Sequence, residues 1–466
     1  MASLADLPQE LVDHIVSELG DDLPSLSTCA LISPAFLHWS RQRLFRSVRV
    51  TASNLYAFGK LIESSPSLAS HIHLLNIPKM DFSAVLPVSL LPRLPNLTRI
   101  VTHRDPFDFR HLSPAETTIL AGAVARLTSV TVLIDRLWTL PAWAALLNAC
   151  PALTHLAVHA EANGWGTWTA DDVALPMPLP STDPVLRLHS LRVSGDCKIL
   201  SPLGAWLLPQ HALAALYTLV LDVDYVLEDY SAPDARLPLV RAAASFLREL
   251  TLSLDPPMPL LPPSPPSDVP PLCLATSFPH LRALHLTDGP DAEIGPSLVW
   301  LAAFLAPPSL APTAAGLQRG YAEVEVGDGP LERLALDHSM TRRDLLGVPA
   351  ATWRALEDAL LGVGACGDFD CAAGAGAGAG RGACGDAADA QILKPRTPTP
   401  TPTPTHTPTY TPTPYPHLRT LTFTGYVRTA RCASDGFELF ATALGERVPR
   451  LAGKGKGGRG VLVVRR

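Results

Sequence analysis

Histidine and cysteine side chains are spaced so that a metal site has to be considered first. His71 and His73 are two residues apart, and on a strand both imidazoles would lie on one face, where they could bind a metal ion. No third ligand is near them in the sequence. Cys366, Cys371 and Cys384 could supply thiolates to zinc, but gaps of four and twelve residues fit no common zinc pattern. We therefore predict no metal site and no other cofactor.

The sequence motifs of common enzyme classes are also missing. There is no G-x-S-x-G nucleophile motif, no H-E-x-x-H motif, no P-loop and no G-x-G-x-x-G that follows a predicted strand. The run GAGAGAG at 374–380 is as rich in glycine as a phosphate loop, but it lacks the Lys-Ser or Lys-Thr that a phosphate loop needs. We predict that the chain is not an enzyme, with a hydrolase hidden in the repeats as a remote alternative.

A nucleic-acid partner is not favoured by the charge of the chain. The net charge is −6, so no bulk attraction to phosphates is expected. Five basic residues near the C-terminus could bind nucleic acid or act as an import signal, although a solvated, frayed tail is the simpler interpretation: Lys454, Lys456, Arg459, Arg465 and Arg466. We predict no nucleic-acid partner.

Composition and cysteine usage indicate a protein of the cytoplasm and/or nucleus and argue against a membrane protein. Hydrophobic residues make up 47% of the 466 residues and charged residues only 17%, which is enough apolar material for a large core. The eight cysteines follow no framework spacing, and no apolar signal segment opens the chain, so we predict reduced thiols in the cytoplasm and/or nucleus. The most apolar window, 199–221, is interrupted by prolines, and we predict that no segment spans a membrane.

A repeated apolar template dominates the chain after residue 50. The pattern L-x-x-L-x-L, with other aliphatic residues or Phe allowed at L, recurs at intervals of 25 to 35 residues between Ile72 and Leu281. Helix-like stretches lie between the copies, and strand followed by helix at a regular period is typical of a leucine-rich-repeat solenoid. The copies begin at Ile72, Leu97 (a weaker copy), Leu127, Leu153, Leu188, Leu216, Leu247, Leu281, Leu331 and Leu418.

The repeats are degenerate and interrupted. No copy has the asparagine that usually follows the strand in such repeats, and five copies have aspartate there, which predicts an irregular horseshoe: Asp105, Asp135, Asp196, Asp224 and Asp255. A proline-rich loop covers 255–271. A longer insertion at about 362–416 combines a Gly/Ala segment with Thr-Pro repeats, which predicts a disordered, partly polyproline segment inside the repeat domain.

The first 50 residues predict three short helices. Pro8 suits the first turn of a helix whose apolar residues Leu11, Val12, Ile15, Val16 and Leu19 recur at helical spacing, and Gly20 is a plausible stop. A second helix is expected around 26–32, and Pro34 can end it and begin a third. Three short helices have too little core of their own, so this unit is expected to lean on a partner or on a neighbouring domain.

Leu7-Pro8-x-Glu10-Leu11, followed by Ile15 and Leu19 and then by LPSLSTCALISPAF, resembles an F-box of the fungal type. The resemblance covers about a tenth of the chain. It implies an F-box domain at 1–50 and a substrate-binding leucine-rich-repeat-like domain at 51–466, an α/β arrangement of a short three-helix unit followed by an irregular solenoid. F-box domains bind the Skp-type adaptor of Skp–cullin–F-box ubiquitin ligases. The family often has Trp where this chain has Phe36.

The resemblance implies a function without catalysis in the chain itself. The chain would be the substrate-recognition subunit of such an E3 ligase, bound through the adaptor to a cullin and capturing an unknown protein substrate for ubiquitin-dependent degradation. The alternative, from a different class, is a structural scaffold whose F-box no longer engages a ligase. Co-purification with the adaptor separates the two possibilities.

Two sets of site residues follow from this hypothesis. The residues expected to bind the adaptor are Leu7, Pro8, Leu11, Ile15, Leu19, Leu26 and Phe36. In each repeat, strand alternation sends the residues between the template positions to the concave face, where a partner is expected to bind. The residues expected to bind substrate there are His155, His159, Arg192, Asp222, Glu249, His285, Arg333 and Asp337.

Overall fold

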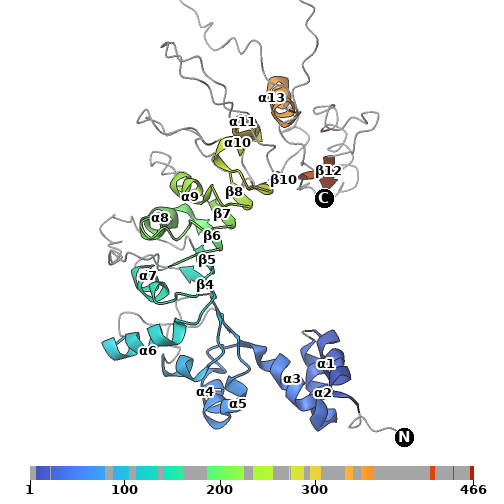
Figure 1. The fold of residues 1–466 in the computed structure, drawn as a ribbon, viewed down its shortest axis with the longest axis vertical. Helices are drawn as coiled ribbons and strands as arrows, with labels where there is room; N and C mark the ends of the chain where they lie inside the picture. The colour runs from blue at the N-terminus through green and yellow to red at the C-terminus, as the bar shows by residue number, and fades with distance from the viewer. Residues whose placement is uncertain are drawn as a thin grey trace, which may run out of the picture.

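The computed structural model has a mixed helix and strand fold built around one parallel sheet (Figure 1). Three helices lie at its N-terminal end, and the strands and remaining helices follow along a curve. The structure describes residues 7–20, 22–78, 88–103, 112–134, 140–161, 186–224, 235–254, 272, 274–287, 294–305, 331–338, 348–361, 420–425, 444 and 462–465.

In the described part of the chain, the sheet has twelve strands whose spatial order is their order along the chain. Every neighbouring pair is parallel, so each connection must return to the same end of the sheet before the next strand starts. The strands are β1 (Ser47–Arg49), β2 (Leu74–Ile77), β3 (Arg99–Thr102), β4 (Ser129–Ile134), β5 (His155–Ala160), β6 (Ser190–Asp196), β7 (Thr218–Asp224), β8 (Glu249–Ser253), β9 (Ala283–Thr287), β10 (Arg333–His338), β11 (Thr420–Gly425) and β12 (Leu462–Arg465).

The apolar template accounts for ten of these strands, β2 to β11. Every template side chain from Ile72 to Leu336 is buried, none more than 7% exposed. The second and third template residues of each copy lie on one face of its strand, and the registers align them with their equivalents in the next strand, as Leu191 with Leu219 and Val193 with Leu221. The prediction of one strand per copy is therefore confirmed, and the mixed α/β class with it.

A backbone ladder joins the copies at the start of each strand. The residue after the first template position accepts, through its carbonyl oxygen, hydrogen bonds from two successive N–H groups of the next copy, at N···O distances of 2.7 to 3.2 Å. The ladder runs without a break from His73 to Glu332. The hydroxyls of Thr98, Thr128 and Thr154 donate to the same carbonyl oxygens at 3.1 to 3.3 Å. The other copies build the ladder from backbone groups, which put no demand on side-chain identity. The accepting residues are His73, Thr98, Thr128, Thr154, His189, Tyr217, Arg248 and Arg282.

Among the five aspartates that replace the usual asparagine, Asp196 has a described side chain. Asp196 is buried, and its Oδ1 accepts a hydrogen bond from the Lys198 backbone N–H at 2.9 Å, which caps the short helix η5 (Cys197–Ile199). Its carboxylate thus holds the turn after β6 by accepting a backbone N–H. The side chains of Asp105, Asp135, Asp224 and Asp255 lie outside the described residues.

The helices that follow β1 cover one face of the sheet. Figure 1 shows α6 to α9 along the outer side of the curve and β4 to β8 along its inner side. The buried side chains of these helices and strands form one continuous core. These helices are α4 (Leu55–Ser64), α5 (Pro66–Ala69), η2 (Val88–Arg93), α6 (Pro114–Val124), α7 (Leu140–Asn148), α8 (Leu200–Leu207), α9 (Arg236–Ala243), α10 (Leu274–Ser277), α11 (Ile294–Leu305) and α13 (Ala350–Leu361).

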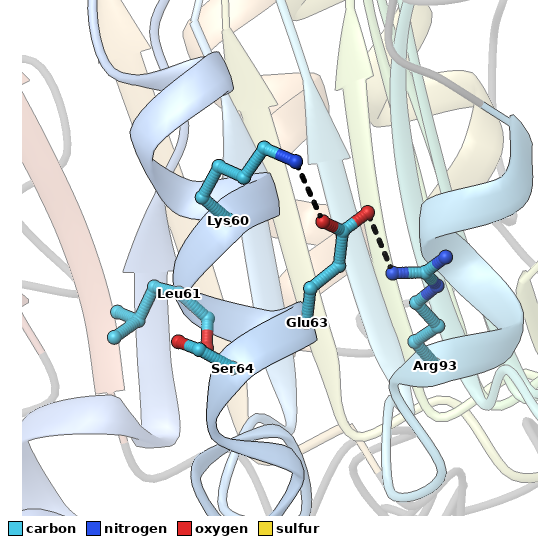
Figure 2. A network of polar contacts seen from close by, with 5 residues as sticks. All are labelled: Lys60, Leu61, Glu63, Ser64 and Arg93. Carbon is cyan, nitrogen blue, oxygen red and sulfur yellow. Dashed lines mark hydrogen bonds and ion pairs between the residues drawn. The ribbon is translucent and has the colours of Figure 1, made fainter.

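An exposed ion-pair network joins α4 to η2 (Figure 2). Glu63 accepts from Lys60 Nζ at 3.1 Å on its own helix and from Arg93 Nη1 at 2.9 Å on η2. The two cations lower the pKa of the Glu63 carboxyl, with the Lys60 hydrogen bond as the larger cause. The buried face of the same helix carries Phe58 and Ile62.

We expect Glu63→Gln to leave the melting temperature unchanged, because exposed ion pairs are screened by water and their side chains lose entropy when they pair. Ile62→Ala on the same helix is expected to cost about 2–4 kcal/mol, because it opens a cavity in the core. Thermal unfolding followed by circular dichroism compares the two variants. A larger loss for the Glu63 variant would contradict this assignment of the helix's stability to its buried face.

Two strands were not predicted. β1 pairs with β2, although its residues were assigned to an N-terminal domain at 1–50, so the sheet begins before that boundary. β12 pairs with β11 through Leu462 to Arg465, so the prediction of a frayed tail is wrong for these four residues. The predicted insertion at 362–416 and the loop at 255–271 lie outside the described residues.

The apolar window at 199–221 forms several short elements of the core, with α8 and part of β7 among them. Within the described ranges, no helix has the length and apolar character needed to cross a membrane.

Candidate functional site

The three N-terminal helices form a unit with its own core. They are α1 (Gln9–Glu18), α2 (Leu23–Ile32) and α3 (Pro34–Arg46). Val12, Val16, Leu26 and Phe36 form their buried cluster, which is separate from the core of the sheet. Near the other end of α3, Phe45 packs against the sheet core, and the chain then enters β1. α3 therefore belongs to both units and connects them directly.

Local sequence explains where these helices begin and end. α1 starts after Pro8 and ends before Gly20, whose φ of +56° is a left-handed conformation that glycine adopts without strain. The Asp22 side chain accepts from the Ser25 backbone N–H and caps α2. Ser33 accepts from the Ala35 N–H and caps α3, in which Pro34 is the first residue. The predicted helix ends at Gly20 and Pro34 are confirmed.

α1 is apolar on two faces. Val12 and Val16, four residues apart, point into the cluster. Leu11 and Ile15 have the same spacing one position earlier, and their side chains are 49% and 41% exposed. A helix of a small isolated domain would have a polar face at these positions, so the second apolar face has no partner among the described residues.

α2 contributes more exposed apolar surface than α1. Leu31 is 88% exposed, and Leu23 and Ile32 are each more than half exposed. We call these three residues, together with Leu11 and Ile15, the exposed apolar set. It contains five of the ten large apolar side chains that are exposed in the described part of the chain, although α1 and α2 together have only 20 residues. Because exposed apolar side chains are concentrated on these two helices, we treat the set as a candidate interaction surface.

The predicted adaptor-binding residues differ in how exposed they are. Leu11, Ile15 and Pro8 are exposed, as the hypothesis requires. Leu7 and Leu19 are partly buried against the unit's own cluster. Leu26 and Phe36, at 1% and 5% exposure, are buried in that cluster with Val12 and Val16 of α1, so in this structure neither side chain reaches the surface.

The exposure of Leu23, Leu31 and Ile32 was not predicted, although the sequence contained a signal for it. Residues 23–32 are apolar nearly all round, and a unit of three short helices cannot bury every side of such a helix. Some of its apolar residues therefore had to remain outside, and only packing against α3 decides which ones.

The second candidate surface is the face of the sheet opposite the helices. Seven of the eight predicted residues have described side chains, and all lie on this face, since each occupies the strand position next to a buried template residue. His155, Arg192, Asp222, Glu249 and Arg333 are exposed, while His159 and His285 are half-buried. The backbone of Asp337 aligns with Thr287, but its side chain lies outside the described residues.

Two of the predicted residues form a direct pair across three strands. Glu249 on β8 and Arg333 on β10 both align with Ala283 on β9. The short side chain of Ala283 leaves room between them, and Arg333 Nη2 lies 3.1 Å from Glu249 Oε1. Thr218 on β7 adds a hydrogen bond to Glu249 Oε2 at 3.4 Å. The two charges neutralise each other. Because both side chains are exposed, the pair contributes little to stability.

His159 lies on the same face of the sheet, on β5 between β4 and β6. Its Nδ1 is hydrogen-bonded to the Ser194 hydroxyl on β6. Burial lowers the pKa of its imidazole, and the nearby Arg192 and His103 lower it further, while Asp222 acts in the opposite direction. The arrangement therefore favours the neutral imidazole at this position.

The lowered pKa makes stability depend on pH. Because the folded chain binds this proton less tightly than the unfolded chain, the stabilisation is fully present above the unfolded-state pKa of about 6.5 and is lost as the pH falls from there through the lower folded-state pKa. We expect the melting temperature to fall between pH 7.5 and pH 5.5, and to fall less in His159→Gln. His71, whose pKa burial also lowers, provides a second variant. Equal pH slopes in wild type and both variants would exclude this origin.

No metal centre is found among the described residues, where no three metal-ligating side chains come together. His71 lies in a turn before β2, so the two-histidine face considered for His71 and His73 does not form on a strand. The His71 ring instead packs edge-on against His38 of α3, with centroids 5.7 Å apart. Cys366, Cys371 and Cys384 lie outside the described residues.

Comparison with known proteins adds no name to these surfaces. No protein-family model matches the chain, and no curated protein matches it either. The functional assignment therefore depends on the residues and on the geometry of the two surfaces.

Proposed function

We propose that the chain is the substrate-recognition subunit of a Skp–cullin–F-box type E3 ubiquitin ligase. The three N-terminal helices serve as the F-box, and the parallel sheet with its helices serves as an irregular leucine-rich-repeat solenoid. The observation that carries the proposal is the exposed apolar set on a unit that already has a core of its own. The protein works in the cytoplasm and/or nucleus, with no nucleic-acid or membrane partner.

The energetics of the exposed apolar set favour a permanent protein partner. Fully burying a leucine or isoleucine side chain is worth about 1.5–3 kcal/mol. Five such side chains, each roughly half exposed or more, therefore leave several kcal/mol of hydrophobic stabilisation for a partner to realise. An apolar groove on a Skp-type adaptor fits this requirement.

The connection between the two units supports a recognition role. α3 shares its side chains between both cores and leads without a loop into β1. A target held on the sheet is then kept at a defined distance from the adaptor. Catalysis by the complex consists of placing that target near a charged conjugating enzyme supplied by other subunits.

Affinity purification tests this proposal. We expect tagged chain, purified from fungal cells in which ligase activity is blocked, to bring down a Skp-type adaptor and a cullin. The variant Leu11→Glu with Ile15→Glu is expected to bring down neither. Absence of both proteins from the wild-type sample contradicts the ligase assignment and favours a scaffold without a ligase.

A further inference from the structure

The sheet face opposite the helices is divided into two halves of different charge. On β7 to β10 acidic and basic residues occur together, and Arg333 is neutralised by Glu249 at 3.1 Å. At the outward positions within β1 to β6 every charged or titratable residue is basic, and none of these strand positions has Asp or Glu. These residues are Arg49, Arg99, His155, His159 and Arg192, and together with His103, which directly follows β3, we call them the basic half-face.

The basic half-face does not follow from the charge of the whole chain, which is −6. Arg49, Arg99 and Arg192 are exposed, and none of them forms an ion pair with a described carboxylate. The nearest described carboxylates in sequence and register are Glu161, just after β5, and Asp222 on β7. Three exposed guanidinium groups on rigid strands, none paired with a carboxylate in the described part of the chain, are positioned for an anionic partner.

We propose that the basic half-face binds an extended acidic segment of a protein partner. The inference deepens the target-recognition role proposed above by naming the chemistry of the target. The row of register partners between Arg49 and Arg192 holds Asn76, Val101, Thr131 and Ala157, small or aliphatic and uncharged residues over which an extended chain can pass. The outward positions of β1 to β6 include no Phe, Tyr or Trp on which bases could stack, so a peptide fits better than a single-stranded nucleic acid.

The strand order sets the spacing of the acidic residues. Arg49, Arg99 and Arg192 lie on β1, β3 and β6, two and then three strands apart. With about 4.8 Å between strands, the gaps across the sheet are roughly 10 and 14 Å. Arg49 and Arg192 lie in the same row of the register, and Arg99 is offset from that row by two residues along the strand. An extended chain rises about 3.3 Å per residue, so carboxylates at about positions 1, 4 and 8 of a segment match the three guanidinium groups.

Binding of a defined peptide tests this proposal. The probe is a fluorescent eight-residue peptide of Ser and Thr with Glu at positions 1, 4 and 8, followed by fluorescence anisotropy with the full chain. We expect saturable binding that weakens as salt is raised. We also expect Arg99→Glu with Arg192→Glu to weaken it by about tenfold or more, and the neutral pair Arg99→Gln with Arg192→Gln to weaken it less.

The controls separate this inference from the other assignments. Arg93→Glu, on η2 at the helical side of the sheet, is expected to leave the affinity for the peptide unchanged. A peptide with its three Glu residues adjacent is expected to bind more weakly. No saturable binding, equal affinity in the double variant, or tighter binding of an eight-nucleotide oligo(dT) would overturn the proposal. Adaptor co-purification by the double variant reports separately on the ligase assignment, which can hold even if the acidic peptide does not bind.

Discussion

Replacing Leu11 and Ile15 together with glutamate is expected to weaken adaptor binding by about 100-fold or more and to leave the fold intact. Both side chains lie outside the cluster of the three-helix unit, so no core contact is lost. Each substitution removes apolar area from the proposed interface and places a charge against an apolar partner. A loss of about 2.7 kcal/mol corresponds to 100-fold in affinity, which two such changes readily reach.

Two other exposed apolar residues provide the matched control. Ile119 on α6 is 44% exposed and Val299 on α11 is 55% exposed, and both lie on helices of the sheet unit. Ile119→Glu with Val299→Glu is expected to leave adaptor affinity unchanged. Isothermal titration gives the affinities, and circular dichroism checks the fold. Equal losses in both double variants would mean that the exposed apolar set has no special role.

Gly195→Ala is expected to be the most destabilising single methyl addition in the described sheet. Gly195 lies on β6 with φ of +90°, a conformation in which any Cβ is strained. A Cβ built there lies 1.9 Å from the carbonyl oxygen of Ala160 on β5, so the backbones of two central strands would have to separate. Strain and overpacking together are expected to cost about 3–5 kcal/mol.

Gly122→Ala is the matched control for this substitution. Gly122 lies in the last turn of α6, and apart from its chain neighbours and the backbone of its own helix no atom lies within 4 Å of the position that its Cβ would occupy. Alanine is expected to stabilise the helix there by about 0.5–1 kcal/mol. Thermal melts should therefore shift in opposite directions. A Gly195 variant that melts within a degree or two of the wild type would contradict the described approach of β5 and β6.

The repeated template made most of the sheet predictable. A leucine-type residue at three fixed positions in each copy specifies both a strand and its buried face, as Leu191 and Val193 show on β6. β1 and β12 escaped because neither carries the template: β1 is only three residues long, and β12 follows a glycine-rich basic segment. Their strand conformation depends on pairing with β2 and β11, which local sequence cannot show.

The candidate surfaces were predictable to different degrees. Helical spacing placed Leu11, Val12, Ile15 and Val16 on the apolar side of α1. It could not show which of them are exposed and which are buried, because the helix is apolar on both faces. The positions of Leu26 and Phe36 depend on how α2 packs against α3, which no local pattern determines. Strand alternation placed the predicted residues of the sheet face correctly, since a period of two allows only two faces.

The central claim is that the exposed apolar set binds a Skp-type adaptor, and hydrogen–deuterium exchange on the purified chain with purified adaptor tests it most directly. We predict a saturable complex with a Kd below about 1 µM. In the complex, amide protection should increase over residues 9–32 and stay unchanged over β4 to β9. Absence of binding at adaptor concentrations of about 100 µM, or protection confined to the sheet, would contradict the account.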